Sequence, residues 1–106
     1  LDIRPMTKGH TLVVPKQETD YLFDLQDDLL ADMMVFAKKV AVAIRSVVPC
    51  KRVGVAVLGM EVPHAHIHLV PLQKESDLSF QRAPVELSKE EMAAIAAQLN
   101  KVFQAL

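Results

Sequence analysis

The stretch His64-Ala65-His66-Ile67-His68-Leu69-Val70 decides how this chain folds, because it alternates imidazole and apolar side chains. Such alternation has the period of a β-strand, in which successive side chains point to opposite faces of the sheet. On a strand, the three imidazoles would form one row with about 6.6 Å between neighbours, and Ala65, Ile67 and Leu69 would face a core. On a helix, successive histidines of this set would be about 200° apart and could not share a site. We therefore predict a strand with three imidazoles along one face.

Three interpretations of this histidine row are open. One histidine on a strand is usually structural or solvated, but three of the chain's four histidines within five residues weaken that interpretation. Imidazoles at i and i+2 can bind one metal ion from one strand, and His10 could supply a further ligand. Imidazole is also a nucleophile and an acid–base group near neutral pH. The pattern favours this catalytic interpretation.

Composition limits what kind of protein this is. With 106 residues, of which 51% are hydrophobic and 24% charged, the chain predicts one globular domain over residues 1–106. Its net charge of −1 gives no electrostatic footprint for nucleic acid, and no apolar run is long enough to span a membrane. The single cysteine, Cys50, excludes an intrachain disulfide and favours a reducing, cytoplasmic setting. Because Leu1-Asp2-Ile3-Arg4 already resembles the inside of a strand, we expect the natural protein to have a further N-terminal segment.

The first half of the chain predicts two strands and a long helix. Residues 1–4, ended by Pro5, and residues 10–15 are expected to pair as a hairpin. A polar loop follows, in which Tyr21-Leu22-Phe23 is expected to be an apolar plug. From residue 27 to residue 48 the apolar period changes to that of a helix. The apolar stripe of this helix contains Leu30, Met33, Met34, Ala37, Val40, Ala41, Ile44 and Val48.

The second half predicts two more strands and a second helix. Residues 51–59 are apolar on both faces, which indicates a strand covered on both sides, one of them by the long helix. A short link joins it to the histidine strand, which ends near Leu72, so the two strands should pair antiparallel. After an irregular segment at residues 73–84, Ser88-Lys89-Glu90-Glu91 is a capping box that begins a helix running to about Gln104. The order β-β-α-β-β-α predicts an α+β fold with an antiparallel sheet, one long central helix and a C-terminal helix.

Two of these motifs resemble those of the histidine triad (HIT) family. His64-Ala65-His66-Ile67-His68-Leu69-Val70 is similar to the family's His-x-His-x-His sequence with two apolar residues behind it. Gly9-His10-Thr11-Leu12-Val13-Val14-Pro15 resembles its Gly-His-x-Leu-Val-x-Pro strand. The similarity extends from Leu1 to about Leu72, and the remainder resembles small bacterial members with a C-terminal helix. The resemblance implies a HIT-like fold, a nucleotide hydrolase or transferase acting at the phosphorus next to the nucleoside, and pairing of two protomers.

The resemblance also implies roles for particular residues. His66 would be the nucleophile that forms a nucleotidyl-imidazole, with His64 and His68 beside the phosphate and His10 supporting the site from a neighbouring strand. Asp2 would hold the ribose hydroxyls. The residues expected to line the nucleotide pocket are Ile3, Leu12, Gly59, Met60, Glu61 and Val62. Many members carry Gln and Ser near the phosphate and Asn on the preceding strand, whereas this chain has Met60, Glu61 and, around that strand position, Val53. These departures bear on the choice of leaving group.

The sequence therefore predicts a nucleotide phosphoramidase or nucleotidyl hydrolase that releases a nucleoside monophosphate from a purine nucleotide. The scheme needs no metal or other cofactor, since a neutral imidazole attacks phosphorus without repelling an anionic substrate. Two alternatives are a nucleotide-binding regulatory protein with little turnover, suggested by Met60 and Glu61, and a zinc-binding protein built on the histidine row. We also expect a homodimer formed by the helix at residues 27–48 and the strand at residues 51–59. These elements present more apolar surface than a domain of this size can cover.

Overall fold

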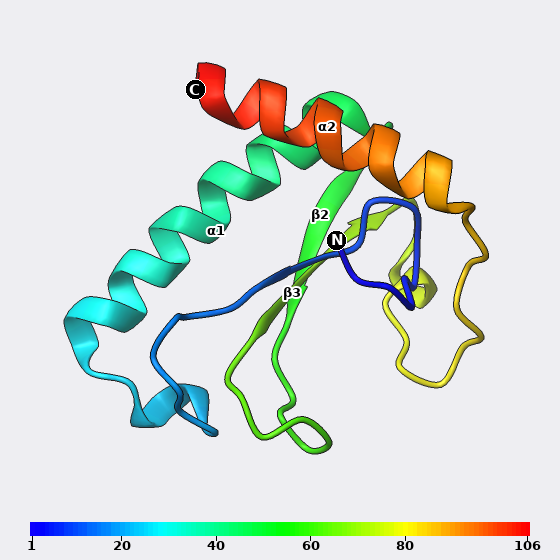
Figure 1. The fold of residues 1–106 in the computed structure, drawn as a ribbon. Helices are drawn as coiled ribbons and strands as arrows, with labels where there is room; N and C mark the ends of the chain where they lie inside the picture. The colour runs from blue at the N-terminus through cyan, green and yellow to red at the C-terminus, as the bar shows by residue number, and fades with distance from the viewer.

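The computed structural model describes all residues, 1–106, as a three-stranded antiparallel sheet with two helices (Figure 1). In chain order the elements are β1 (Thr11–Val13), the 3₁₀ turn η1 (Leu22–Asp24), α1 (Asp27–Val47), β2 (Arg52–Ala56), β3 (Ile67–Leu72), the 3₁₀ turn η2 (Glu75–Asp77) and α2 (Lys89–Ala105). The central strand is β3, which pairs antiparallel with β1 on one side and with β2 on the other. The predicted α+β fold with an antiparallel sheet, one long helix and a C-terminal helix is confirmed.

The hydrophobic core lies between α1 and one face of the sheet. Ala65, Ile67 and Leu69 are each exposed by 2% or less, and they join one buried cluster with side chains of α1. The cluster contains Val13, Leu22, Leu25, Met33, Ala37, Ile44, Val48, Ala65, Ile67 and Leu69. Because side chains alternate along an extended chain, His66 and His68 lie on the face away from α1.

The long helix α1 begins at the predicted residue and ends one residue before the predicted end. Asp27 and Asp28 lie in its first turn and Arg45 in its last turn, where each charge complements the helix dipole. Val48 is the C-cap, and Pro49 follows it. The predicted apolar stripe faces the core apart from Met34, which is 46% exposed.

The second helix, α2, begins with the predicted capping box and packs on α1. The Ser88 hydroxyl accepts the N–H of Glu91 (3.0 Å), and the Glu91 carboxylate accepts the N–H of Ser88 (3.4 Å). The Phe103 ring lies 5.5 Å from the Phe36 ring of α1. Figure 1 shows α2 crossing α1, which leaves the histidine face of the sheet uncovered by helix. Neither helix combines the length and the hydropathy that a membrane-spanning helix requires.

Residues 1–4 do not form the predicted strand, so the prediction of an N-terminal hairpin was wrong. Only one backbone hydrogen bond joins residues 1–4 to residues 10–15, from the N–H of Asp2 to the carbonyl of His10 (2.9 Å). The Asp2 carboxylate accepts the N–H of Arg4 (2.8 Å), which turns the chain. Pro5 has no N–H with which to continue a ladder. β1 pairs with β3 instead, and the order of the main elements is β-α-β-β-α.

The other predicted strands are shorter in the structure than their sequence patterns. β1 ends at Val13 because Pro15 follows, and β2 ends at Ala56 rather than at Gly59. The predicted apolar plug was correct for Leu22 alone, which is 5% exposed. Tyr21, the N-cap of η1, and Phe23 within η1 flank Leu22 and are 57% and 68% exposed, because a turn cannot direct three consecutive side chains inward.

The predicted histidine strand is also shorter, since β3 begins only at Ile67. His64 lies in a bend, where its N–H donates to the carbonyl of Val62 (2.9 Å), and His66 lies between this bend and β3. There the N–H of Ala65 donates to the carbonyl of Thr19 (2.7 Å), a loop residue, rather than to a neighbouring strand. His68 is therefore the one histidine of the row within the hydrogen-bonded sheet, and His10 immediately precedes β1.

We expect Gly9→Ala to lower the free energy of unfolding by roughly 1–3 kcal/mol, because it combines backbone strain with overpacking. Gly9 has a φ of +94°, and an added Cβ would lie 2.8 Å from Cγ2 of Val48 and 3.2 Å from Cγ of Pro71. Gly59→Ala is the matched control, since Gly59 has a φ of +71° but nothing lies within 4 Å of its added Cβ. Urea unfolding of both variants makes the comparison. Equal losses of stability would show that the contact with Val48 carries no cost.

Candidate active site

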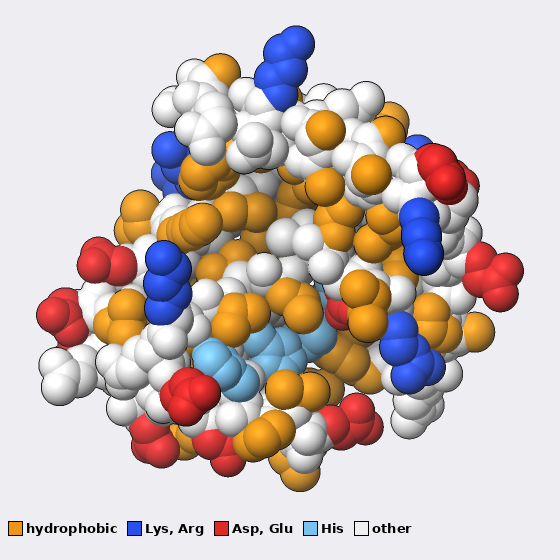
Figure 2. Space-filling view, viewed as in Figure 1, with side chains coloured by type: hydrophobic (Ala, Val, Ile, Leu, Met, Phe, Trp, Pro, Cys, Tyr) orange, Lys and Arg blue, Asp and Glu red, His pale blue; other side chains and the backbone are white.

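A pocket of about 550 Å³ brings together His66 and His68, the N-terminal part of the chain and the segment after β3. Figure 2 shows the imidazoles along the floor of a hollow in one face of the molecule. The N-terminal part contributes Asp2, Arg4, Met6, His10 and Leu12 to its lining. The segment before β3 and β3 itself contribute Leu58, Gly59, Met60, Glu61, Val62, His66 and His68, and the segment after β3 contributes Ser79, Phe80, Arg82 and Pro84.

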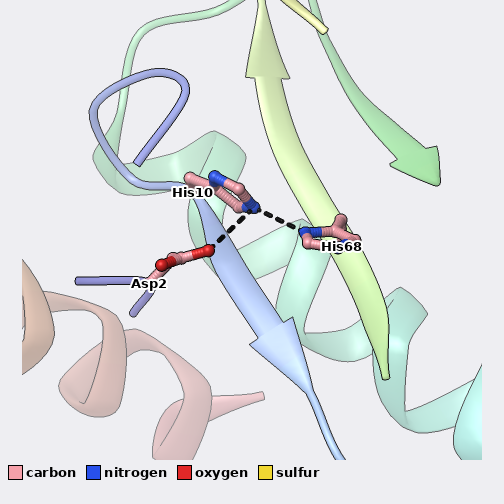
Figure 3. A group of neighbouring side chains, drawn as sticks. All are labelled: Asp2, His10 and His68. Carbon is pink, nitrogen blue, oxygen red and sulfur yellow. Dashed lines mark hydrogen bonds and ion pairs between the residues drawn. The ribbon is translucent and has the colours of Figure 1, made fainter. Parts of the chain in front are cut away.

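A chain of hydrogen bonds determines where His10 and His68 carry their protons (Figure 3). The Nδ1 atom of His10 accepts the backbone N–H of Met6 (3.0 Å), so a neutral His10 carries its proton on Nε2. That Nε2–H points to Nδ1 of His68, 2.9 Å away, which must accept it. The proton of His68 is consequently on its own Nε2. The Asp2 carboxylate lies 3.6 Å from Nε2 of His10 and completes the cluster drawn in Figure 3.

Burial keeps His10 and His68 neutral near neutral pH. His10 is 1% exposed and His68 is 8% exposed. The pKa of His68 is lowered to about 4, mainly by burial and also by the nearby His10 and His66, while Asp2 acts in the opposite direction. Burial also lowers the pKa of His10, against the opposing effect of the Asp2 charge. His68 can therefore offer an N–H donor at Nε2, but neither ring supplies a positive charge.

His66 has the opposite tautomer. Its Nδ1 lies 2.8 Å from the carbonyl oxygen of His64, which can only accept, so Nδ1 carries the proton. Nε2 of His66 then has a free lone pair and no hydrogen-bond partner in the protein. The ring centroids of His66 and His68 are 4.8 Å apart, and both rings line the pocket. An unprotonated imidazole nitrogen thus lies beside an imidazole N–H donor.

His64 is held differently from the other histidines. Its Nε2–H donates to the carbonyl oxygen of Pro15 (2.9 Å), and the residue does not line the pocket. The structure therefore brings His10, His66 and His68 together and turns the Nε2 end of His64 toward the loop after β1.

The residues predicted to line a nucleotide pocket lie around the same hollow, with one exception. Asp2, Leu12 and the predicted residues Gly59, Met60, Glu61 and Val62 all line it. Ile3 does not, because its side chain is 88% exposed and points away from the protein. The Met60 side chain lines the pocket but is 87% exposed, so most of it faces solvent.

Sequence reasoning missed the part of the site that follows β3. The Phe80 ring packs edge-on against the His68 imidazole, with centroids 4.9 Å apart and an interplanar angle of 79°. Ser79, Arg82 and Pro84 line the pocket beside it. One sequence feature could have indicated this part of the site: Phe80 is the one aromatic residue in the polar stretch at residues 73–84. Met6 was missed because it acts through its backbone N–H, which no side-chain pattern reveals.

The hydrogen bonding disfavours a metal ion at this cluster. Ligand atoms of Asp2, His10 and His68 lie within 4.8 Å of one another, which fits the spacing of a metal site. A metal on Nε2 of His10 would require a proton on Nδ1 or a fully deprotonated ring. A proton on Nδ1 of His10 would face the backbone N–H of Met6, which already points at this atom, so two donors would oppose each other. This donor arrangement suits an imidazole relay better than zinc.

Comparison with known proteins identifies a family and several relatives. The HIT domain family model matches residues 1–75. An adenosine 5′-monophosphoramidase of Schizosaccharomyces pombe is 31% identical over 103 residues, which cover 94% of this chain and 77% of the relative. An asymmetrical bis(5′-nucleosyl)-tetraphosphatase of the same organism is 30% identical over 100 residues, which cover 86% and 53%. A zinc-bound histidine triad family protein from Mycobacterium smegmatis has the same fold, with a TM-score of 0.77, 31% identity and coverage of 100% of this chain and 79% of that one. The chain thus spans about half to four fifths of the length of these relatives.

We expect the free energy of unfolding to fall as the pH is lowered from about 6.5 toward about 4. The pKa of His68 is about 4 in the folded protein and 6.5 in an unperturbed histidine, so the unfolded chain binds a proton first and acid favours unfolding. His10 acts in the same direction, since its pKa is also lowered. Urea unfolding at several pH values tests this, with His68→Gln expected to flatten the dependence. Constant stability over this range would contradict the neutral, buried imidazoles.

Proposed function

Because this chain belongs to the histidine triad (HIT) family, we propose that it is a nucleotide hydrolase that cleaves the bond between the α-phosphorus and a leaving group. The product is a nucleoside monophosphate, and the substrate is a purine nucleotide phosphoramidate or a related nucleotidyl compound. One observation carries the proposal: the His64 carbonyl holds the proton of His66 on Nδ1 and leaves Nε2 as a free nucleophile among other imidazoles. The names of the relatives, a phosphoramidase and a tetraphosphatase, support a nucleotide substrate.

In the first step, the lone pair on Nε2 of His66 attacks the α-phosphorus. A P–N bond forms, the bond to the leaving group breaks, and the leaving group departs with the electron pair of that bond. The leaving group takes a proton from solvent. The Nε2–H of His68 donates to a non-bridging phosphate oxygen and stabilises the charge that develops there.

In the second step, water attacks the phosphorus of the nucleotidyl-imidazole. The P–N bond breaks, its electron pair returns to Nε2 of His66, and the monophosphate leaves while the water loses a proton to solvent. Splitting one displacement into two lowers the barrier of each. The Asp2 carboxylate lies beside His10 on the pocket wall. In this scheme it accepts hydrogen bonds from the ribose hydroxyls.

We expect His66→Ala to reduce single-turnover hydrolysis of an adenosine phosphoramidate by about 10⁴-fold or more, as when other catalytic nucleophiles are removed. Affinity for AMP should largely survive, because the other residues of the pocket are unchanged. His64→Ala is the matched control and should lose less activity, since His64 forms no bond to phosphorus. Rapid-quench kinetics and calorimetry measure the two quantities. A His66→Ala variant with wild-type turnover would remove the nucleophile from the mechanism, and wild-type protein that binds nucleotide without turnover would favour the regulatory alternative.

We also propose a homodimer that uses α1 and β2. The outer edge of β2 has no pairing strand, and Val55 on this strand is 53% exposed. On α1, Met34, Val35 and Phe36 are 46%, 69% and 43% exposed. Apolar side chains that gather on two elements in this way are typical of an interface between copies of a chain.

Sedimentation at micromolar concentration should show a dimer for the wild-type protein and a monomer for Val55→Lys. A stable interface buries well over about 1,000 Å², and a lysine in its apolar part would leave a charge without a partner. Ala94→Lys, on an exposed position of α2, is the control and should remain dimeric. A monomeric wild-type protein would contradict the proposal.

A further inference from the structure

When a nucleotide is bound, the neutral His10 and His68 do not balance the negative charge of its phosphate. A phosphate ester is anionic, whereas His10 and His68 are held neutral by burial and by their hydrogen bonds. The charged side chains on the pocket are Asp2, Glu61, Arg4 and Arg82. Any positive charge that faces the phosphate must therefore come from one of the two arginines.

Arg82 is the arginine whose position the protein controls. Its Nη1 donates to the backbone carbonyl of Asp77 (3.3 Å) and to Oδ1 of the same residue (3.1 Å). Asp77 is 8% exposed, and its Oδ2 accepts the N–H groups of Gln73 (2.9 Å) and Lys74 (3.1 Å). These bonds, with that of Arg82, lower the pKa of the Asp77 carboxyl and keep it ionised. The guanidinium of Arg4, by contrast, is exposed and makes no ion pair.

The hydrogen bonds to Asp77 leave most of the Arg82 guanidinium free to bind a ligand. Arg82 has five N–H donors, and those on Nε and Nη2 make no hydrogen bond within the protein. Its side chain is 35% exposed and forms part of the pocket wall. Phe80, two residues earlier, touches the His68 ring, and two residues of chain span at most about 7 Å. The free N–H donors of Arg82 thus lie on the same wall of the pocket as Phe80, which packs against the His68 ring.

We propose that Arg82 is a specificity-determining residue that binds the phosphate oxygens of the nucleotide. The inference rests on the proposed function for the identity of the ligand. The planar fork of a guanidinium matches two oxygens of a phosphate group. Asp77 orients the fork in advance, so little side-chain freedom is lost on binding. Met60 and Glu61, on another part of the pocket, have no side-chain donor to offer in its place.

Calorimetry with two probes, AMP and adenosine, tests the proposal without requiring turnover. Arg82→Ala should weaken AMP binding about 10- to 100-fold, as expected for the loss of a hydrogen bond to a charged group. Adenosine binding should stay at the wild-type level, because adenosine has no phosphate. Arg82→Lys keeps the charge without the fork and should fall between the two. Lys101→Ala, an exposed cation on α2, is the control and should change neither affinity.

Several outcomes would overturn the proposal. Equal weakening of AMP and adenosine, together with a lower Tm, would mean that Arg82 only holds the segment after β3 in place. Unchanged AMP affinity in Arg82→Ala, or no AMP binding by the wild-type protein, would remove the phosphate contact. If Arg82→Ala does not fold, Arg82→Gln keeps a polar contact to Asp77 and answers the same question. Wild-type protein that binds AMP in an Arg82-dependent way but hydrolyses no nucleotide would refute the hydrolase and leave this inference standing.

Discussion

The alternation of side chains along residues 64–69 is the constraint on which both halves of the molecule depend. One set of alternate residues, Ala65, Ile67 and Leu69, is almost fully buried against α1. Of the other set, His66 and His68 line the pocket, whereas His64 bonds to Pro15. A slip of one residue would place imidazoles in the core and apolar side chains in the site. The pairing of His68 with Leu12 on β1 and with Ala56 on β2 fixes the register from both sides.

The chemistry of the site follows from two backbone groups as much as from the imidazoles. The N–H of Met6 sets the tautomer of His10, and through it that of His68. The carbonyl of His64 sets the opposite tautomer in His66. In the proposed mechanism, three chemically identical rings thereby acquire different roles, as a relay, a donor and a nucleophile. The turn between Met6 and His10 contains Gly9, whose φ of +94° few other residues adopt.

The segment after β3 forms the wall of the site that the N-terminal part of the chain does not supply. Its polar sequence is folded by the buried Asp77 carboxylate, which accepts two backbone N–H groups and one guanidinium N–H. Further along, the N–H of Val85 donates to the carbonyl of Pro5 (2.8 Å), so this segment also meets the N-terminal turn. Phe80 thereby comes to lie against His68, and its ring adds to the burial that keeps this imidazole neutral.

The sequence by itself determined the features that repeat over short distances. The helical stripe at residues 27–48, the capping box at Ser88 and the alternation around His66 all reflect local geometry, and each predicted element appears near its expected place.

Tertiary structure decided where strands end and which segments meet. Residues 1–4 had the composition of a strand but no neighbouring strand to pair with, because the Asp2 turn and Pro5 interrupt them. The bond between His10 and His68 joins residues 58 positions apart, and Arg82, which lines the pocket, bonds to the buried Asp77. Such contacts depend on how elements pack in three dimensions, and periodicity along the chain carries no information about them.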